Sequence, residues 1–483
     1  MIIRILVATV TACLLSACGD SDGETPPPIT PTEDTTINED TKPPPPVCED
    51  QSDEDFLILF GYRNRLPGTN EYDVQMIRPI QKYEPLQLTD FSLKDEGKTC
   101  EFGCLVDESM DWIAVNGSPP DQDGFDFQMG KFDDCLNVKL VKFDSLVDKA
   151  HFTFAKDYIY YSQKTNCNGP ACQYEIWRLN LVTFEQDLLV PFFPPAEDPD
   201  WVNGDTIYKG RFTVSPDGES LVLLSPTIRS QRVYLWNKTL HEVDYLCDNF
   251  QNETCIGAGS QYSDNDPLAI SPDSQSVVLF TITDRALRVR RYSTVNPDDK
   301  GSSPLLAVPP NAGGDYRSLA CVYREPWQWT DVIGQPVYTP DGNNVLFVGH
   351  AACDPSQDKA ETDIIKMDPS WIGDLSPVEE HELINLTNNA KGDVTANTQI
   401  TSIALSPDGR RVVYTATPQL STSWNPIQDS DDRHFSDHEV YMMSVCGGAK
   451  TQLTSNVKYE ASSPVALPFP NLEACPASPL TEQ

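Results

Sequence analysis

The feature that most constrains the fold of this chain is a turn sequence that recurs four times between short apolar runs. It reads Ser/Thr-Pro-Asp-Gly/Ser and begins at Ser215, Ser271, Thr339 and Ser406. Mainly apolar or β-branched residues precede each copy, and another apolar run begins three residues after it. Proline presets φ for a turn, aspartate hydrogen-bonds neighbouring backbone, and glycine adopts positive φ. Each copy predicts two strands joined by a tight turn, and four copies predict a repeated all-β fold.

Two further elements follow the hairpins and complete a four-stranded unit. Runs with strand composition lie at residues 72–77, 363–368 and 439–443. Each run leads to a Leu-Thr pair: Leu88-Thr89, Leu386-Thr387 and Leu453-Thr454. The pattern resembles the blades of TolB-like (PD40) β-propellers, and the resemblance covers residues 55–470, roughly. It implies a single all-β ring of four-stranded antiparallel sheets.

The repeated landmarks predict the number of blades. Six blade cores fall near residues 104–147, 151–190, 208–246, 267–308, 335–388 and 400–454. The first two of these lack the turn sequence. A seventh blade begins at its second strand at residues 56–60, and residues 462–467 supply its first strand, so the C-terminal strand closes the ring and pairs the free sheet edges. We expect seven blades, and six or eight are also compatible with the landmarks.

The first 17 residues indicate export. One charge at Arg4 precedes an apolar stretch at residues 5–15, which is shorter than the ~18 residues of a membrane span. Leu15-Ser16-Ala17-Cys18 resembles the lipobox of bacterial lipoproteins, which implies that residues 1–17 are a signal peptide and that Cys18 is lipidated. An ordinary signal peptide followed by an unrelated cysteine is the alternative. The lipobox implies a lipid-anchored protein of the bacterial envelope, with Gly19 compatible with the outer membrane, facing the periplasm or the cell surface.

Residues 18–50 predict a disordered linker between the anchor and the propeller. This segment is rich in Pro, Thr, Asp and Glu and has few groups that can be buried. Residues 19–23 match G-x-S-x-G, but the strand and helix that a nucleophile elbow requires do not surround them. We therefore expect a linker at 18–50, a propeller at 51–475 and a tail at 476–483.

The charge of the chain excludes one class of partner. Asp and Glu number 72 against 35 Lys and Arg, which gives a net charge of −37. Such a surface repels phosphate backbones, so we expect no nucleic-acid partner. Solubility in a salty medium explains the acidity more simply than cation binding does.

The cysteines predict disulfide bonds. Of 14 cysteines, Cys13 leaves with the signal peptide and Cys18 takes lipid, so an even number remains in an exported chain. The strand directions implied by the propeller resemblance favour four pairs: Cys167–Cys172, Cys247–Cys255, Cys321–Cys353 and Cys446–Cys475. They leave Cys48, Cys100, Cys104 and Cys135 to form two more, with unassigned connectivity. A zinc site is the alternative for the closely spaced cysteines, but the spacing fits poorly.

Long insertions indicate where a partner binds. The resemblance places the connections at residues 191–207, 309–335 and 417–438 on one face of the ring. Long loops on a rigid scaffold, with exposed aromatics, favour binding. The candidate binding residues are Trp201, Tyr316, Tyr323, Trp327, Trp329, Trp424 and His434. Packing within the loops themselves is the alternative role for these side chains.

Two function classes remain open. The first is a non-catalytic propeller, anchored in the membrane by lipid, that binds an envelope protein or polymer. The second is a carbohydrate-active or other metal-dependent enzyme in the propeller funnel. The six histidines are scattered, and for the polar cluster at residues 431–439 we favour a solvated loop over a metal site. We therefore assign no catalytic residue, metal or cofactor, and the sequence does not indicate an oligomeric state.

Overall fold

The computed structural model divides the chain into two units, residues 1–49 and 50–483, and all described residues belong to the second unit. They are residues 56–64, 71–79, 86–87, 105–106, 112–117, 126–132, 138–141, 149–168, 171–195, 212–226, 230–248, 256–257, 268–283, 286–296, 298–302, 307–308, 317–318, 333–354, 359–373, 383–387, 400–416, 438–455 and 459–468.

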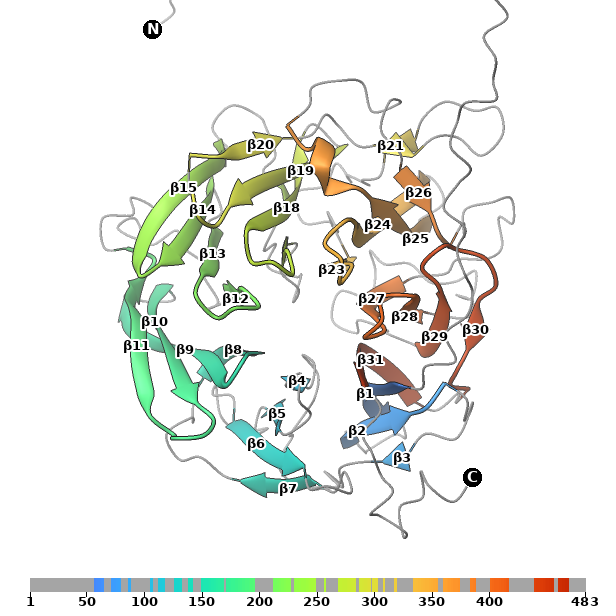
Figure 1. Ribbon diagram of the computed structural model, residues 1–483, viewed down its shortest axis with the longest axis horizontal. Coiled ribbons are helices and arrows are strands. Elements are labelled where there is room, and N and C mark those ends of the chain that lie inside the picture. The colour runs from blue at the N-terminus through green and yellow to red at the C-terminus, as the bar shows by residue number, and fades with distance from the viewer. Residues whose placement is uncertain are drawn as a thin grey trace, which may run out of the picture. The chain divides into compact units, whose positions relative to one another are not determined.

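Within these residues, seven antiparallel sheets of four or five strands stand in a ring (Figure 1). Blade 1 contains β4 (Leu105–Val106), β5 (Trp112–Gly117), β6 (Asp126–Phe132) and β7 (Val138–Val141). Blade 2 contains β8 (Lys149–Ala155), β9 (Tyr158–Asn168), β10 (Ala171–Asn180) and β11 (Gln186–Phe193). Blade 3 contains β12 (Phe212–Val214), β13 (Leu221–Pro226), β14 (Ser230–Asn237) and β15 (Thr239–Asp248).

The remaining sheets continue the ring. Blade 4 contains β16 (Ile256–Gly257), β17 (Leu268–Ile270), β18 (Ser276–Thr283), β19 (Ala286–Ser293) and β20 (Lys300–Ser302), and the hairpin of β21 (Ala307–Val308) and β22 (Arg317–Ser318) follows it. Blade 5 contains β23 (Ile333–Tyr338), β24 (Val345–Asp354), β25 (Lys359–Met367), the 3-10 helix η4 (Pro369–Trp371) and β26 (Leu383–Asn385). Blade 6 contains β27 (Ile400–Leu405), β28 (Arg411–Ala416), β29 (Glu439–Ser444) and β30 (Thr451–Gln452).

The two ends of the described chain share the closing blade. It contains β31 (Tyr459–Pro468), β1 (Phe56–Asn64), β2 (Glu71–Ile77) and β3 (Leu86–Gln87). β31 pairs with β1 in antiparallel register, with Leu467 opposite Leu57 and Val465 opposite Leu59. The fold is thus an all-β propeller, and its C-terminal strand completes the sheet that the N-terminal strands begin, as the sequence predicts.

In most blades the strands run outward from the centre in chain order (Figure 1). In the closing blade the order is β31, β1, β2, β3, and in blade 4 both β16 and β17 pair with β18. Neighbouring blades meet through their inner strands, in the pairs β4–β8, β8–β12, β12–β17, β17–β23, β23–β27 and β27–β31. Because consecutive strands are antiparallel, the turns between first and second strands lie on one face, and the connections between second and third strands lie on the other.

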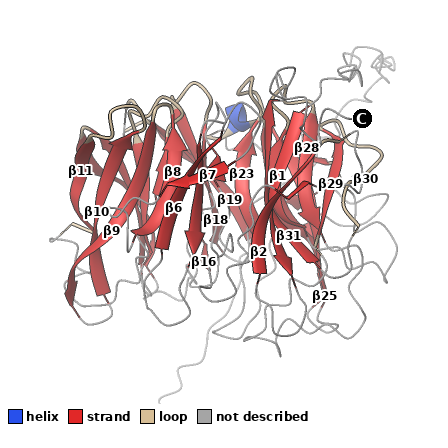
Figure 2. Cartoon of the chain, turned by 90° about the horizontal axis from the view of Figure 1, so that it is seen from below, coloured by secondary structure: helices blue, strands red, loops and turns tan. Residues whose placement is uncertain are grey.

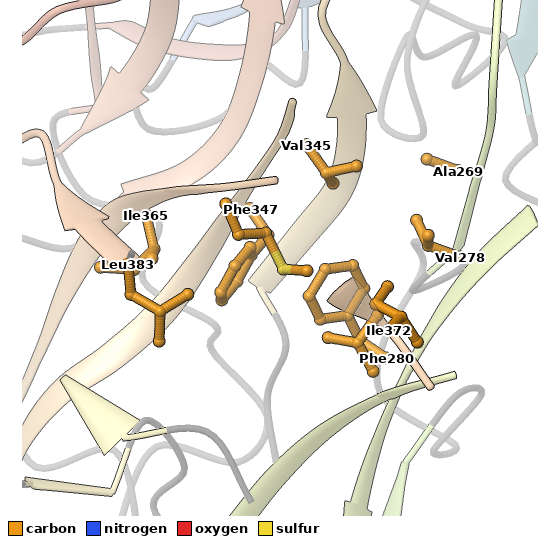
Figure 3. Close-up of a cluster of buried hydrophobic side chains, with 10 residues drawn as sticks. Ala269, Val278, Phe280, Val345, Phe347, Ile365, Ile372 and Leu383 are labelled. Atoms are coloured by element: carbon orange, nitrogen blue, oxygen red, sulfur yellow. The ribbon is translucent and has the colours of Figure 1, made fainter. Parts of the chain in front are cut away.

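The core is a series of apolar layers between blades. In one layer, Val278 and Phe280 of blade 4 pack against Val345 and Phe347 of blade 5 (Figure 3). The ring centroids of Phe280 and Phe347 are 4.6 Å apart. Similar layers join blade 1 to 2, blade 2 to 3, blade 3 to 4, blade 5 to 6, and blade 6 to the closing blade. Since each sheet buries both faces against its neighbours, one blade depends on the next for its stability. None of the described helical residues forms a stretch long and apolar enough to cross a membrane.

Candidate functional site

The four repeated turns share one hydrogen-bond pattern. In blade 3, the Ser215 hydroxyl donates to Asp217 Oδ1 at 2.5 Å and accepts from the Ser220 N–H at 2.9 Å. The Asp217 carboxylate also accepts the Glu219 N–H at 3.0 Å. The same three bonds recur at the turns of blades 4, 5 and 6 with nearly identical distances. The motif therefore fixes a turn with its own hydroxyl and carboxylate.

These bonds lower the pKa of the turn carboxyls in blades 4 and 5. A hydrogen bond from Ser271, with one from the Gln275 N–H, holds the pKa of Asp273 below its usual value. The bond from Thr339 has the same effect on the pKa of Asp341. Each bond stabilises the ionised form, so these carboxylates are ionised at neutral pH and are not proton donors there.

The turns also contact one another from blade to blade. The Tyr160 hydroxyl of blade 2 donates to the Gly218 carbonyl at 2.9 Å, and the Asp217 N–H donates to Ser274 Oγ of blade 4 at 3.0 Å. A Cβ placed on Gly409 would lie only 2.6 Å from Cδ of Pro340 in blade 5. We call residues 215–218, 271–274, 339–342 and 406–409 the turn ring; Figure 2 shows the described turns along one edge of the strands.

A second buried polar set explains the Leu-Thr pairs. The Thr387 hydroxyl accepts the Ile364 N–H at 2.9 Å and donates to Asp363 at 2.7 Å, so it joins the third and fourth strands of blade 5. Thr454 makes the equivalent bonds in blade 6, to the Val440 N–H at 2.9 Å and to the Glu439 carboxylate. We call these the acid–threonine pairs; their polar atoms are satisfied within the sheet, which assigns them a structural role.

The acid–threonine pair of blade 6 corrects one expectation. The sequence suggested a solvated loop at residues 431–439, but His438 and Glu439 are buried. Glu439 is the first residue of β29, and its carboxylate accepts the Thr454 hydroxyl. Glu439 therefore belongs to the sheet, as the predicted strand run at residues 439–443 requires, and the buried His438 directly precedes it.

The described carboxylates and cysteines do not form a metal centre. No group of three or more His, Cys, Asp or Glu side chains suited to a metal ion occurs in this part of the chain.

An ion cluster joins β15, the outer strand of blade 3, to β19 and β20 of blade 4. Asp244 accepts Arg290 Nη1 at 3.0 Å and the Tyr292 hydroxyl at 2.9 Å, and Lys300 Nζ lies 3.3 Å from its other oxygen. Burial, with the Asp244 charge, raises the pKa of Tyr292, so this hydroxyl remains a donor. Sequence reasoning missed the cluster because Asp244 is 46 to 56 residues from its three partners, so no local pattern indicates it.

The predicted binding connections begin and end at described strands. β11 ends at Phe193 and β12 begins at Phe212, β28 ends at Ala416 and β29 begins at Glu439, and β23 begins at Ile333 after the β21–β22 hairpin. These are connections between blades or between second and third strands, so the strand order puts their ends on the face opposite the turn ring. The proposed contact residues themselves lie outside the described residues: Trp201, Tyr316, Tyr323, Trp327, Trp329, Trp424 and His434.

The disulfide predictions can be placed in part. Cys172 and Cys446 each take part in a disulfide bond. Cys172 stands directly opposite Cys167 in the β9–β10 register. Cys247 is in β15 and Cys353 in β24. The pairings remain predictions. The other cysteines lie outside the described residues: Cys13, Cys18, Cys48, Cys100, Cys104, Cys135, Cys255, Cys321 and Cys475.

Sequence reasoning also missed an apolar surface on blade 2. Its outer strand and the turn before it expose Val182, Phe184, Leu188 and Phe192. The sequence does contain the signal for this surface, because β11 carries large apolar residues although it is the outermost strand of its blade.

Similarity to known proteins is found among solved structures. No protein-family model matches the sequence, and no curated protein is similar to it. Among solved structures, TolB from Acinetobacter baumannii is 12% identical, with a TM-score of 0.38, over 86% of this chain and 67% of TolB. A putative 6-phosphogluconolactonase from Bacteroides uniformis is 11% identical, with a TM-score of 0.43, over 85% of this chain and 100% of its own. The β-propeller domain of the trilobed protease from Pyrococcus furiosus is 9% identical, with a TM-score of 0.41, over 83% and 94%. These likenesses concern the fold alone.

Proposed function

We propose that this chain is a lipid-anchored, non-catalytic propeller of the bacterial envelope that binds a protein or polymer with the face opposite its turn ring. The observation on which this depends is the position of the strand ends. By strand order, the strand ends that flank the predicted connections at residues 191–207 and 417–438 belong to that face, as does the start of β23 after residues 309–335. These connections contain the aromatic residues that typically form the centres of binding interfaces.

The described polar groups support a scaffold role. The turn ring, the acid–threonine pairs and the Asp244 cluster use their carboxylates in bonds within the propeller. Contacts between turns and the Asp244 cluster join neighbouring blades. The strand ends from which the long connections start are therefore fixed in position. Such preorganisation lowers the entropy that binding costs.

Recovery of the partner from envelope extract tests the binding face. The bait is the full-length protein, compared with Trp327→Ala/Trp329→Ala/Trp424→Ala and with Val295→Ala as an exposed control in blade 4. An interface aromatic typically contributes on the order of 2 kcal/mol, so the triple variant should recover the partner at least tenfold less well. Equal recovery by all three baits would move the site to another face. Stoichiometric transition metal in the purified protein would instead support an enzyme.

Cell fractionation tests the anchor separately. Cys18→Ser removes the residue that takes lipid and should release the protein into the soluble fraction, because acyl chains supply the membrane affinity. Unchanged membrane association of this variant would contradict the lipobox interpretation. It would have no bearing on the proposed binding face.

A further inference from the structure

Large exposed apolar side chains are concentrated on one blade. Val182 is 75% exposed and Phe184 48% in the turn between β10 and β11, and Leu188 is 43% and Phe192 50% exposed in β11. We call these four residues the β11 surface; β11 is the outer strand of blade 2 in Figure 1. Val295 of blade 4 is the one other large apolar side chain exposed within the described residues. Grouped exposure of this kind marks interaction sites, whereas single exposed residues do not.

An outer strand does not need such a surface. In blade 3 the outer strand β15 exposes His241 and Glu242, while Val243 is buried and Leu240 is partly buried. β11 also buries apolar residues, Val190 and Phe193, but unlike β15 it exposes Leu188 and Phe192. Among the outer strands whose exposure the structure describes, this apolar exposure is particular to blade 2.

The edge of β11 is poorly suited to pairing with another strand. Pro191 has no backbone N–H to donate, and the β10–β11 register shifts on both sides of Val190. Proline and bulges are features that prevent edge-to-edge pairing. A partner would therefore contact the side chains of β11 and not extend its sheet.

The charges beside the surface select the kind of partner. Glu185 and Asp187 are exposed and alternate in sequence with the apolar residues. The nearby described cations are engaged, because Arg178 pairs with Asp187 at 3.1 Å and Lys131 lies over the Trp112 ring at 5.6 Å. Trp112 also contacts Phe184 edge to face, with ring centroids 6.2 Å apart. With a net charge of −37, the chain repels a second copy of itself and an anionic lipid surface, and attracts a basic partner.

We propose that the β11 surface docks a cationic amphipathic helix of a partner protein, with an apolar row against Phe184, Leu188 and Phe192 and Lys or Arg beside Glu185. Leu188 and Phe192 supply the apolar contact. Glu185 sets the orientation of the helix, because Asp187 is already paired with Arg178. Phe192 lies at the start of the 191–207 connection, but the three tryptophans changed in the binding-face test belong to the other two connections, so either proposal can fail alone.

A model helix tests the inference. The probe is a fluorescently labelled 18-residue helical peptide of Leu and Lys with its Leu on one face, compared with a Leu/Glu peptide of the same pattern. Anisotropy is measured against the full chain carrying Cys18→Ser, exported so that its disulfides form. We expect the Leu/Lys peptide to bind, and Leu188→Ser/Phe192→Ser to weaken it at least tenfold, whereas the control Val295→Ser leaves affinity unchanged.

A second variant distinguishes loss of docking from loss of folding. Glu185→Lys leaves every apolar side chain in place and should weaken the Leu/Lys peptide at least threefold at low salt. Equal binding by all variants, equal loss in Val295→Ser, or tighter binding of the Leu/Glu peptide would overturn the proposal. So would binding of phosphatidylcholine vesicles in place of the peptide, or a dimer in gel filtration that Leu188→Ser/Phe192→Ser abolishes.

Discussion

Blades 2 and 6 have the same four-stranded plan, but they close their first hairpins differently. In blade 6, Ser406 and Asp408 hold the turn through their side chains, and Gly409 adopts a φ of 70°. In blade 2, Ala155 pairs directly with Tyr158 across a two-residue turn, and Lys156 has a φ of 49°. Ala155 has no hydroxyl, so the side-chain bonds of blade 6 are absent from this turn.

The difference shows what the repeated motif adds. A hairpin forms with or without it, but the motif brings its turn against the next one. Gly409 lies against Pro340, whereas blade 2 reaches its neighbour through the Tyr160 hydroxyl on the Gly218 carbonyl. The motif therefore joins blades, and a blade that lacks it uses another side chain for the same purpose.

Gly409→Ala should cause the largest loss of stability. Positive φ costs about 1–2 kcal/mol in a residue with a Cβ, and the added atom would overlap Pro340, which typically costs a further ~1–3 kcal/mol. Gly342→Ala is the control, since its φ is 72° but its Cβ would lie 3.8 Å from Pro272. Urea unfolding of both variants measures the difference, and equal losses would remove the blade-to-blade contact from the explanation.

Gly218→Ala and Tyr160→Phe should be coupled. The Cβ of Ala at 218 would lie 2.7 Å from the Tyr160 hydroxyl, and Tyr160→Phe removes that oxygen along with its bond to a buried carbonyl. We expect each single variant to lose about 1–3 kcal/mol. The double variant should lose less than the sum by about 1 kcal/mol. Strict additivity in the double-mutant cycle would show that the contact between blades 2 and 3 contributes nothing.

Ser406→Ala should cost about 1 kcal/mol, because Asp408 and the Arg411 N–H lose their shared hydroxyl. The reverse change in blade 2, Ala155→Ser, should alter stability by less than about 0.5 kcal/mol. In the two-residue turn of blade 2 no backbone N–H is placed as the Arg411 N–H is in blade 6, so the new hydroxyl gains no such bond. Thermal unfolding compares the two, and a gain from Ala155→Ser equal to the loss from Ser406→Ala would mean that both turns accept the same chemistry.

The smallest effect concerns acid sensitivity. The pKa of Asp273 is lowered in the fold, so its contribution is complete above the unfolded carboxyl pKa of about 3.9 and is lost as the pH falls through the lower folded pKa. Ser271→Ala removes the largest cause of that shift. The variant should therefore lose less stability than the wild type on acidification below pH 4, roughly. Ala155→Ser serves as the control, and parallel acid titrations of Ser271→Ala and the wild type would contradict the assignment.

Local patterns explain what the sequence could predict. The turn motif, the Leu-Thr pairs and the unpaired strands at the two ends are short segments whose chemistry fixes their structure, so the propeller and its closure follow from them. The Asp244 cluster and the bond from Tyr160 to Gly218 depend on residues 46 or more positions apart, and no spacing indicates them. The burial of His438 and the exposure of Phe192 depend on neighbouring strands. The aromatic binding residues stay a prediction.

Hydrogen–deuterium exchange of Gly409→Ala tests the central claim, that the motif joins neighbouring blades. Local opening should increase wherever the lost contact contributed stability. We predict faster exchange in the β27–β28 hairpin of blade 6 and also in the β23–β24 hairpin of blade 5, which contains Pro340, with the β8–β9 hairpin of blade 2 unchanged. Faster exchange confined to β27–β28 would contradict the claim and reduce the motif to a local turn.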